Sequence, residues 1–219
     1  MFKKLKAFTL AEVMIVVALI GITTMLTLPA LNSNMEEKKA VAALRKLYPE
    51  LETAYTAMVK DYGKPVEWNV PSTATAADMN EMFRERIKPY LNVAIDCGTD
   101  IGCFTSSSNL VLNDDAVRFL LKDGASIAFE LKSMSDMKSS YTTAVSNKFD
   151  TNCQGELGNI YVDVNGLKGE NAFDYDIFQL KMCYSNGLIP FDNAAWVIKV
   201  GNRDYNKCEV NLDTKRTCN

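Results

Sequence analysis

The sequence contains no histidine among its 219 residues. Histidine is the commonest general base near neutral pH and the commonest neutral metal ligand. The sequence also lacks a G-x-S-x-G nucleophile motif, a P-loop and a dinucleotide-binding fingerprint. These absences argue against bond-making chemistry, and we expect a protein that is not an enzyme.

The sequence also has no excess of positive charge. The chain has 24 lysines and arginines against 27 acidic residues, a formal net charge of −3. Nucleic-acid binding requires a basic face that neutralises phosphates, so we expect no direct contact with nucleic acid. The hydrophobic content of 47% fits a folded chain, and the length allows one globular domain plus an extra element.

Cysteine is absent from the first 96 residues, and all six cysteines follow an apolar segment. An even number in that position indicates disulfides formed outside the reducing cytoplasm. Fifteen pairings are possible, and the short closures are the natural local ones. Zinc binding or free thiols is the alternative, weakened by the absence of histidine and of C-x-x-C spacing. The expected bonds are Cys97–Cys103, Cys208–Cys218 and, from the remaining two, Cys153–Cys183.

The longest apolar run extends from Phe8 to Leu31. As a helix it would be roughly 36 Å long, enough to cross the core of a bilayer. Lys3, Lys4 and Lys6 precede it, so the positive-inside rule places the N-terminus in the cytoplasm. The sequence therefore predicts a transmembrane helix, with the remainder of the chain on the far side of the membrane.

Glu12 is the exceptional residue of this run. A secretory signal peptide has a similar basic start, and "LPALNS" offers a cleavage region, but the apolar stretch exceeds the usual length of about 7 to 15 residues. An ordinary signal anchor leaves the acid unexplained, since an isolated acid in the membrane costs on the order of a few kcal/mol. Cleavage between Ala7 and Phe8 would create an α-amine that neutralises Glu12 on the same chain or a neighbour. We then expect packing with related chains.

The run "KAFTLAEVMIVVALIGI" resembles the N-terminal cleavage and methylation signal of type IV prepilins and of type II secretion pseudopilins. The shared features are a short basic leader, a small residue, a phenylalanine, a Thr-Leu pair and a glutamate fifth in the mature chain. Gly21 and Pro29 lie where pilin helices commonly carry a glycine and a kinking proline. Ala7 departs from the pattern, in which glycine is commonest, and this puts the efficiency of processing in doubt.

The resemblance implies that a prepilin peptidase cuts after Ala7 and methylates the Phe8 amine. It implies an α+β, type IV pilin-like fold, with a long helix, membrane-embedded in its first half, packed on a head that contains a small antiparallel sheet. Glu12, Gly21 and Pro29 are the expected assembly residues.

The implied function is that of a structural subunit, a major or minor pilin or a pseudopilin, in a type IV pilus or a type II secretion pseudopilus. Its partners would be other such subunits and, indirectly, an assembly platform and ATPase. The precursor would cross the bacterial inner membrane once, with its head in the periplasm or in a surface filament. A non-polymerising adhesin or receptor with a pilin-like anchor is the alternative, and an anchored hydrolase is a more distant one.

Beyond Leu31 the apolar residues recur at spacings of three and four, which predicts that the helix continues to Tyr62 with Gly63 as its stop. The expected division is a leader over 1–7, a helix over 8–62 with its transmembrane part at 8–31, and a head over 63–219. Pro29 and Pro49 are expected to bend or loosen the helix, because each removes a backbone donor. The predicted apolar stripe is Val41, Leu44, Leu47, Tyr48, Leu51, Tyr55, Met58, Val59 and Tyr62.

The pattern of apolar and turn-forming residues in the head predicts a second helix over Ala76–Lys88, ended by Pro89. Four or five antiparallel strands are expected to follow. Asp123-Gly124 is expected to form a type I′ hairpin turn. The polar stretch 133–151 is expected to be an exposed loop, and the last twelve residues to be held by the Cys208–Cys218 bond. The predicted strands lie in "VRFLLKDGASIAFEL", "NIYVDVNG", "FQLKMCYSNGLIPF" and "AAWVIKV".

The stretch "DVNGLKGENAFDYD" is the one candidate for a metal site, because it contains several oxygen ligands around two glycines. It does not match the twelve-residue EF-hand spacing, although some pseudopilin heads hold calcium in the corresponding region. The interpretation that we favour is a turn with solvated acids, so no cofactor is predicted and calcium is the alternative. Trp68 and Trp196 are expected to pack in the core. The possible ligands are Asp163, Asn165, Glu170, Asn171, Asp174 and Asp176.

Overall fold

The structure is a computed structural model that describes residues 9–104, 110–141, 144–146, 152–168, 171–173 and 175–201. Of residues 25–34, 144–146 and 152 it describes the backbone alone. The chain divides into two compact units, Met1–Lys39 and Ala40–Asn219. Helix α1, Leu10–Tyr62, begins in the first unit and ends in the second.

From Leu10 to Ile22, α1 carries apolar side chains on all sides, with Glu12 as its one charged residue. Five successive residues from Val13 to Val17 each expose about half or more of their side chain. At 100° per residue, five successive positions surround a helix completely. The exposed large apolar side chains of this part are Leu10, Val13, Met14, Ile15, Val16, Val17, Leu19, Ile20 and Ile22.

Within the part of the chain that the structure describes, no helix combines the length and the apolar character needed to cross a membrane. The span expected over 8–31 lies partly outside the described residues, because Phe8 and the side chains of 25–34 are not among them. The transmembrane assignment therefore stays a prediction.

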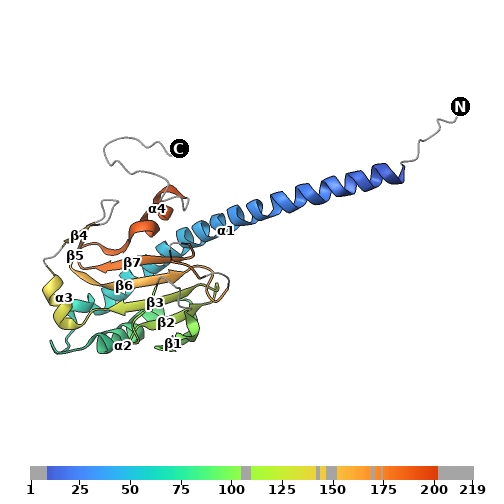
Figure 1. Cartoon of the computed structure of the whole chain (residues 1–219). Helices are drawn as coiled ribbons and strands as arrows, with labels where there is room; N and C mark the ends of the chain where they lie inside the picture. Colours follow the sequence, from blue (N-terminus) through green and yellow to red (C-terminus); the bar gives the residue numbers. More distant parts are fainter. Residues whose placement is uncertain are drawn as a thin grey trace, which may run out of the picture. The chain divides into compact units, whose positions relative to one another are not determined.

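The second unit is an α+β domain built on a six-stranded antiparallel sheet, in the order β1-β2-β3-β6-β7-β8 (Figure 1). This confirms the expected α+β class and antiparallel order, whereas the type IV pilin-like form of the fold stays a prediction. The expectation of four or five strands is too low. Two short strands, β4 (Ala144–Ser146) and β5 (Asn152–Gln154), form a separate pair. The strands of the main sheet are β1 (Val93–Gly98), β2 (Val117–Leu121), β3 (Ser126–Leu131), β6 (Glu156–Asp163), β7 (Ile177–Cys183) and β8 (Gly187–Pro190).

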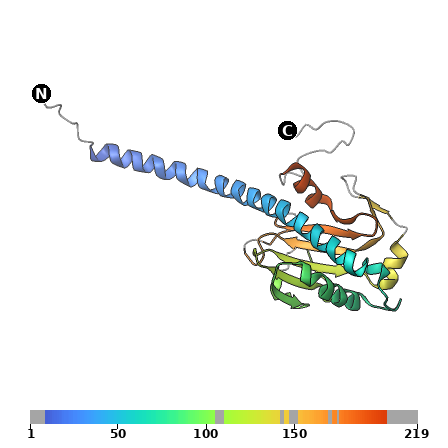
Figure 2. The ribbon, with the colours of Figure 1, turned by 180° about the vertical axis from the view of Figure 1, so that it is seen from behind.

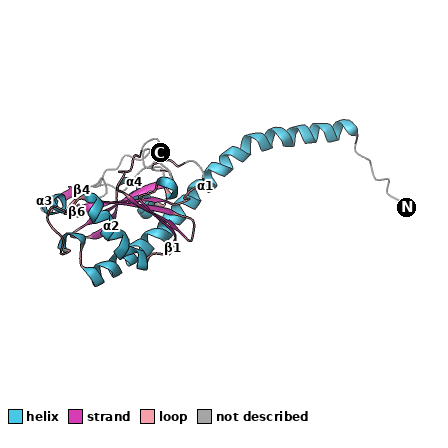
Figure 3. Cartoon of the chain, turned by 90° about the horizontal axis from the view of Figure 1, so that it is seen from below, coloured by secondary structure: helices cyan, strands magenta, loops and turns pink. Residues whose placement is uncertain are grey.

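One face of this sheet carries the main core. The part of α1 from Val41 to Met58 and helix α2 (Ala76–Ile87) lie across it (Figures 2 and 3). Helix α1 ends at Tyr62, before Gly63, at the position that its apolar periodicity indicates. Both tryptophans are buried, as expected for core residues. The centre of the core is formed by Leu44, Leu47, Leu51, Met58, Phe83, Phe119, Phe129, Ile160 and Leu180.

The opposite face of the sheet carries a smaller apolar cluster. Because side chains alternate along a strand, Ala128 and Tyr161 point away from the main core, while their neighbours Phe129 and Ile160 point into it. Ile177, the first residue of β7, joins this second cluster. The loop between β6 and β7 therefore starts and ends at the edge of the smaller cluster.

The sequence predicts "AAWVIKV" as a strand, and this prediction is wrong. Residues Asp192–Val200 form helix α4. A short apolar run fits a buried strand or a buried helix equally well. Here the contacts at the C-terminal end of the segment favour the helix. Arg45 of α1 donates two hydrogen bonds to the Ile198 carbonyl, and Gly201 takes the left-handed conformation of a helix C-cap and donates to the Val197 carbonyl.

Two further expectations for the head need correction. Gly124 has a positive φ but Asp123 does not, so the β2–β3 turn is not type I′, which requires positive φ at both central residues. The stretch 133–151 is not a simple exposed loop, since it contains helix α3 (Met134–Ser140), with Met134 and Met137 fully buried. The overlooked signal is Ser133, whose hydroxyl caps α3 by accepting from the Asp136 backbone N–H.

Two of the three expected disulfides are present, Cys97–Cys103 and Cys153–Cys183. The expected third, Cys208–Cys218, lies outside the described residues. The described part of the head also contains the 3₁₀ turns η1 (Pro65–Glu67), η2 (Lys88–Tyr90) and η3 (Ile101–Cys103). Disulfide Cys153–Cys183 links β5 to the main sheet, whereas Cys97–Cys103 closes a loop on β1.

The two disulfides are expected to differ in their contribution to stability. Their sequence separations are 30 and 6 residues, and loop entropy predicts losses of about 3 to 4 kcal/mol for Cys153→Ala/Cys183→Ala and about 2 kcal/mol for Cys97→Ala/Cys103→Ala. Urea denaturation of the full chain in detergent measures both. Equal losses would show that loop entropy does not dominate the contribution of these disulfides to the free energy of unfolding.

Candidate functional site

The N-terminal end of α1 is closed by a capping box between Thr9 and Glu12. The Thr9 backbone N–H and hydroxyl both donate to Glu12 Oε2, at 2.9 and 2.8 Å, and the Glu12 N–H donates to Thr9 Oγ1 at 3.3 Å. The sequence reasoning overlooked this local role, although the T-x-x-E spacing is its signal. Glu12 therefore has a local structural function in the single chain.

The capping box does not supply Glu12 with a positive charge. Among the residues that the structure describes, no basic group lies within ion-pair distance of its carboxylate. Ala7 and Phe8, the expected cleavage residues, lie outside the described part. The structure thus shows Glu12 held in one orientation at the start of an apolar helix, with its charge uncompensated by any described side chain.

The other two expected assembly residues, Gly21 and Pro29, lie within α1. A Cβ placed on Gly21 would meet no neighbouring atom within 4 Å, so no contact with the described residues requires a glycine there. The side chain of Pro29 is not described, but the helix continues through both Pro29 and Pro49. Thr23 bonds through its hydroxyl to the Leu19 and Ile20 carbonyls, which satisfies a polar group on an otherwise apolar surface.

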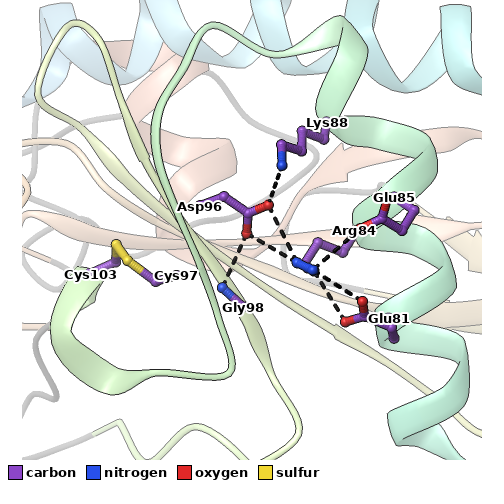
Figure 4. Close-up of polar contacts among 8 residues, drawn as sticks. All are labelled: Glu81, Arg84, Glu85, Lys88, Asp96, Cys97, Gly98 and Cys103. Atoms are coloured by element: carbon purple, nitrogen blue, oxygen red, sulfur yellow. Dashed lines mark hydrogen bonds and ion pairs between the residues drawn. A yellow bond between two sulfur atoms is a disulfide. The ribbon is translucent and has the colours of Figure 1, made fainter.

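A second polar cluster joins α2 to the edge strand β1 (Figure 4). The Asp96 carboxylate receives Lys88 Nζ at 2.7 Å and Arg84 Nη1 at 3.4 Å, and it also accepts from the Gly98 N–H. Burial raises the pKa of Asp96, but the Lys88 and Gly98 hydrogen bonds and the charge of Arg84 outweigh it, so the pKa is lowered. Since Cys97 follows directly, this cluster positions the disulfide loop.

The β6–β7 loop contains the candidate calcium ligands, and the structure brings three of them together. Asn165 Nδ2 donates to Asp176 Oδ2 at 3.0 Å, and the backbone N–H groups of Asn165 and Gly166 donate to Asp163 Oδ1 at 3.2 and 2.9 Å. Asp176 Oδ1 also accepts from the Ala172 N–H at 2.7 Å. Glu170 and Asp174 lie outside the described residues.

The favoured interpretation of this loop, a turn with solvated acids, is wrong for Asp163 and Asp176. Asp163 is 0% exposed and Asp176 is 6% exposed. Burial, together with the neighbouring Asp176 carboxylate, raises the pKa of Asp163 to about 7. Within the described part of the chain there is no group of three or more histidine, cysteine or acidic side chains that could hold a metal. Any cation here would use two carboxylates and neutral oxygens.

Comparison of the chain with protein-family models, with curated proteins and with solved structures gave no match. The family resemblance therefore rests on the N-terminal motif alone.

The Asp96 cluster predicts a defined pH dependence. Because its folded pKa is lowered, Asp96 stabilises the head above its unfolded pKa of about 4, and this contribution is lost as the pH falls through the folded pKa. Asp96→Asn should lower the free energy of unfolding by about 1 to 2 kcal/mol at pH 7, with a smaller difference at pH 3. Urea denaturation at both values measures it.

The matched control is Glu85→Gln, which removes a more exposed partner of the same arginine. We expect it to change stability by less than about 0.5 kcal/mol. An Asp96→Asn effect that stays constant between pH 7 and pH 3 would contradict the assignment.

Proposed function

We propose that this chain is a membrane-anchored structural subunit of a filament of the type IV pilus or type II secretion pseudopilus kind. The observation that carries the proposal is the start of α1, where a surface that is apolar on all sides is interrupted by the acid Glu12. In a soluble domain a helix covers its apolar side chains by packing, and one that is apolar all round is normally buried in protein or lipid. A filament subunit would have its helix in lipid before assembly and among the helices of other subunits after assembly.

Glu12 makes the packing selective. A carboxylate in an apolar environment is costly unless a positive charge reaches it, and no described side chain of the same chain supplies one. Cleavage after Ala7 would supply the Phe8 amine, one residue before the capping threonine. A neighbouring subunit that brings this amine to Glu12 fixes the axial position of the two helices. The capping box supports this role, because it holds the carboxylate at the end of the helix in advance.

The head would form the surface of the filament. Its two described disulfides and its main core indicate a stable domain suited to an oxidising compartment. Loss of Lys3, Lys4 and Lys6 changes the formal charge from −3 to −6, with 21 basic and 27 acidic residues left. The proposal requires a prepilin peptidase, an assembly platform and an ATPase as partners, and it assigns no catalytic step to this chain.

Processing is the first test of the proposal. In bacterial cells with an active prepilin peptidase, mass spectrometry of the purified protein should give a mature N-terminus at Phe8 carrying one methyl group. Ala7→Gly should be cut at least as efficiently, because glycine is the commoner residue at this position in the family that the motif resembles. A chain that keeps Met1, or that begins beyond Leu31, would refute the proposal.

The second test separates the intermolecular role of Glu12 from its capping role. Glu12→Gln removes the charge but keeps an oxygen that can accept the Thr9 hydrogen bonds, whereas Thr9→Val removes the hydroxyl and keeps the charge. We expect Glu12→Gln to reduce the protein recovered in sheared filaments about tenfold or more, with membrane levels unchanged, because the charge pair is lost. Thr9→Val should assemble nearly normally.

The opposite pattern, with Thr9→Val impaired and Glu12→Gln normal, would show that only the cap matters. Unchanged surface display in both variants, without any filament in the wild type, would favour the non-polymerising adhesin or receptor.

A further inference from the structure

Two tyrosine rings lie against each other at the surface of the head. The centroids of the Tyr141 and Tyr184 rings are 4.4 Å apart, and the ring planes are inclined at 51°. Ring pairs of the main core, such as Phe83–Phe129, are buried. Tyr141, by contrast, is 40% exposed and Tyr184 is half-buried. Small reagents in solution can therefore reach this pair.

Gly155, between β5 and β6, allows the two tyrosines to approach each other. Its φ is +68°, and its carbonyl accepts from the Tyr184 N–H at 2.8 Å. A Cβ added to Gly155 would lie 2.9 Å from Tyr184 Cβ and 3.5 Å from the Tyr141 Cα and carbonyl oxygen. Any other residue at this position would press against both tyrosines and would be strained at a positive φ. The pair is therefore held by three separate segments of the head.

The hydroxyl groups of the two tyrosines also lie together. The Tyr184 hydroxyl donates to Glu67 Oε1 at 3.1 Å, and the Tyr141 hydroxyl is within hydrogen-bond reach of it. These contacts, that of Tyr141 first, raise the pKa of Tyr184 to about 12. The Lys64 N–H donates to Glu67 Oε2 at 3.1 Å and fixes the carboxylate. Because the two Cε atoms of a tyrosine flank the carbon that carries the hydroxyl, neighbouring hydroxyls bring Cε atoms of the two rings close together.

We propose that Tyr141 and Tyr184 are an oxidative cross-linking site, at which a peroxide acting through a peroxidase joins the two rings by a Cε–Cε bond. Each ring loses one electron and its hydroxyl proton, and Glu67 accepts the proton of Tyr184. The two phenoxyl radicals couple, and the two Cε protons then move to the phenolic oxygens. The peroxide takes up the two electrons and two protons and becomes two molecules of water. This proposal is independent of the filament function.

Proximity favours this bond over a bond between two chains. Two reacting groups that are already in contact avoid the entropy cost of meeting, whereas coupling between chains depends on their encounter. The bond would tie the end of α3 to the connection between β7 and β8. Tyr184 follows Cys183 directly, so the new bond would lie beside the Cys153–Cys183 disulfide. Unlike that disulfide, it would survive thiol reagents.

The test is oxidation of the full chain in detergent by a haem peroxidase with an equimolar amount of hydrogen peroxide. After reduction of the disulfides and digestion with trypsin, mass spectrometry should find peptides 139–148 and 182–199 joined, with a mass two hydrogen atoms below their sum. The intact protein should remain a monomer on a denaturing gel. The absence of the joined peptides, or dityrosine found between separate chains alone, would overturn the proposal.

Three tyrosine variants locate the bond. Tyr141→Phe and Tyr184→Phe keep the rings but remove one hydroxyl, and each should lower the dityrosine fluorescence of the monomer by about tenfold or more, because the reacting partner is lost. The control is Tyr175→Phe, which changes a tyrosine that is 61% exposed and should keep the wild-type yield. An equal loss in all three variants would show that the reaction follows exposure and would refute the assignment.

Two glycine variants test the role of the close approach. Gly155 and Gly124 both have a positive φ, but a Cβ on Gly124 would meet no neighbouring atom within 4 Å. Gly155→Ala should lower the yield by about tenfold, because it displaces the rings, whereas Gly124→Ala should leave the yield unchanged. The comparison separates displacement of the rings from backbone strain. A normal yield in Gly155→Ala would contradict the proposed geometry.

Discussion

The packing of one helical stripe against one face of the sheet is the interaction on which the head depends. From Val41 to Met58, the apolar residues of α1 meet those of α2 and of the central strands in the main core. Each large side chain buried in this way contributes about 1.5 to 3 kcal/mol. The exposed apolar side chains from Leu10 to Ile22 of the same helix are not part of this core.

The acids of the head show how the fold distributes charge. Asp96 and Glu156 each lie against two basic side chains, one pair at the β1 edge and one beside the Cys153–Cys183 bond. Asp163 and Asp176 are as well shielded, and the described donors to their carboxylates are neutral N–H groups. Within the described head, the fold therefore neutralises Asp96 and Glu156 with basic side chains, whereas it holds Asp163 and Asp176 by hydrogen bonds.

The same reasoning applies to Glu12 at the other end of the chain. Its hydrogen bonds are local and neutral, and its charge is left for a partner to balance. In both places the described chain orients a carboxylate without neutralising it. The two differ in their surroundings, because Glu12 lies at an exposed helix start and Asp163 is buried at the end of β6.

The sequence alone determined the local features, because these depend on short-range physics. The periodicity that continues to Tyr62, the second helix before Pro89, the hairpin around Gly124 and the short Cys97–Cys103 closure each involve residues close along the chain. Tertiary structure decided what local pattern leaves ambiguous. "AAWVIKV" became a helix because Arg45 and Gly201 complete its C-terminal end.

The burial of Asp163 was likewise set by tertiary structure. It depends on the pairing of β6 with β3 and β7, and nothing within the stretch 163–176 specifies those neighbours. From sequence alone, an acidic, glycine-containing loop is predicted to be exposed to solvent, because the strands that pack beside it are not known. Local sequence therefore specified most of the elements, whereas long-range strand pairing specified which polar groups are buried.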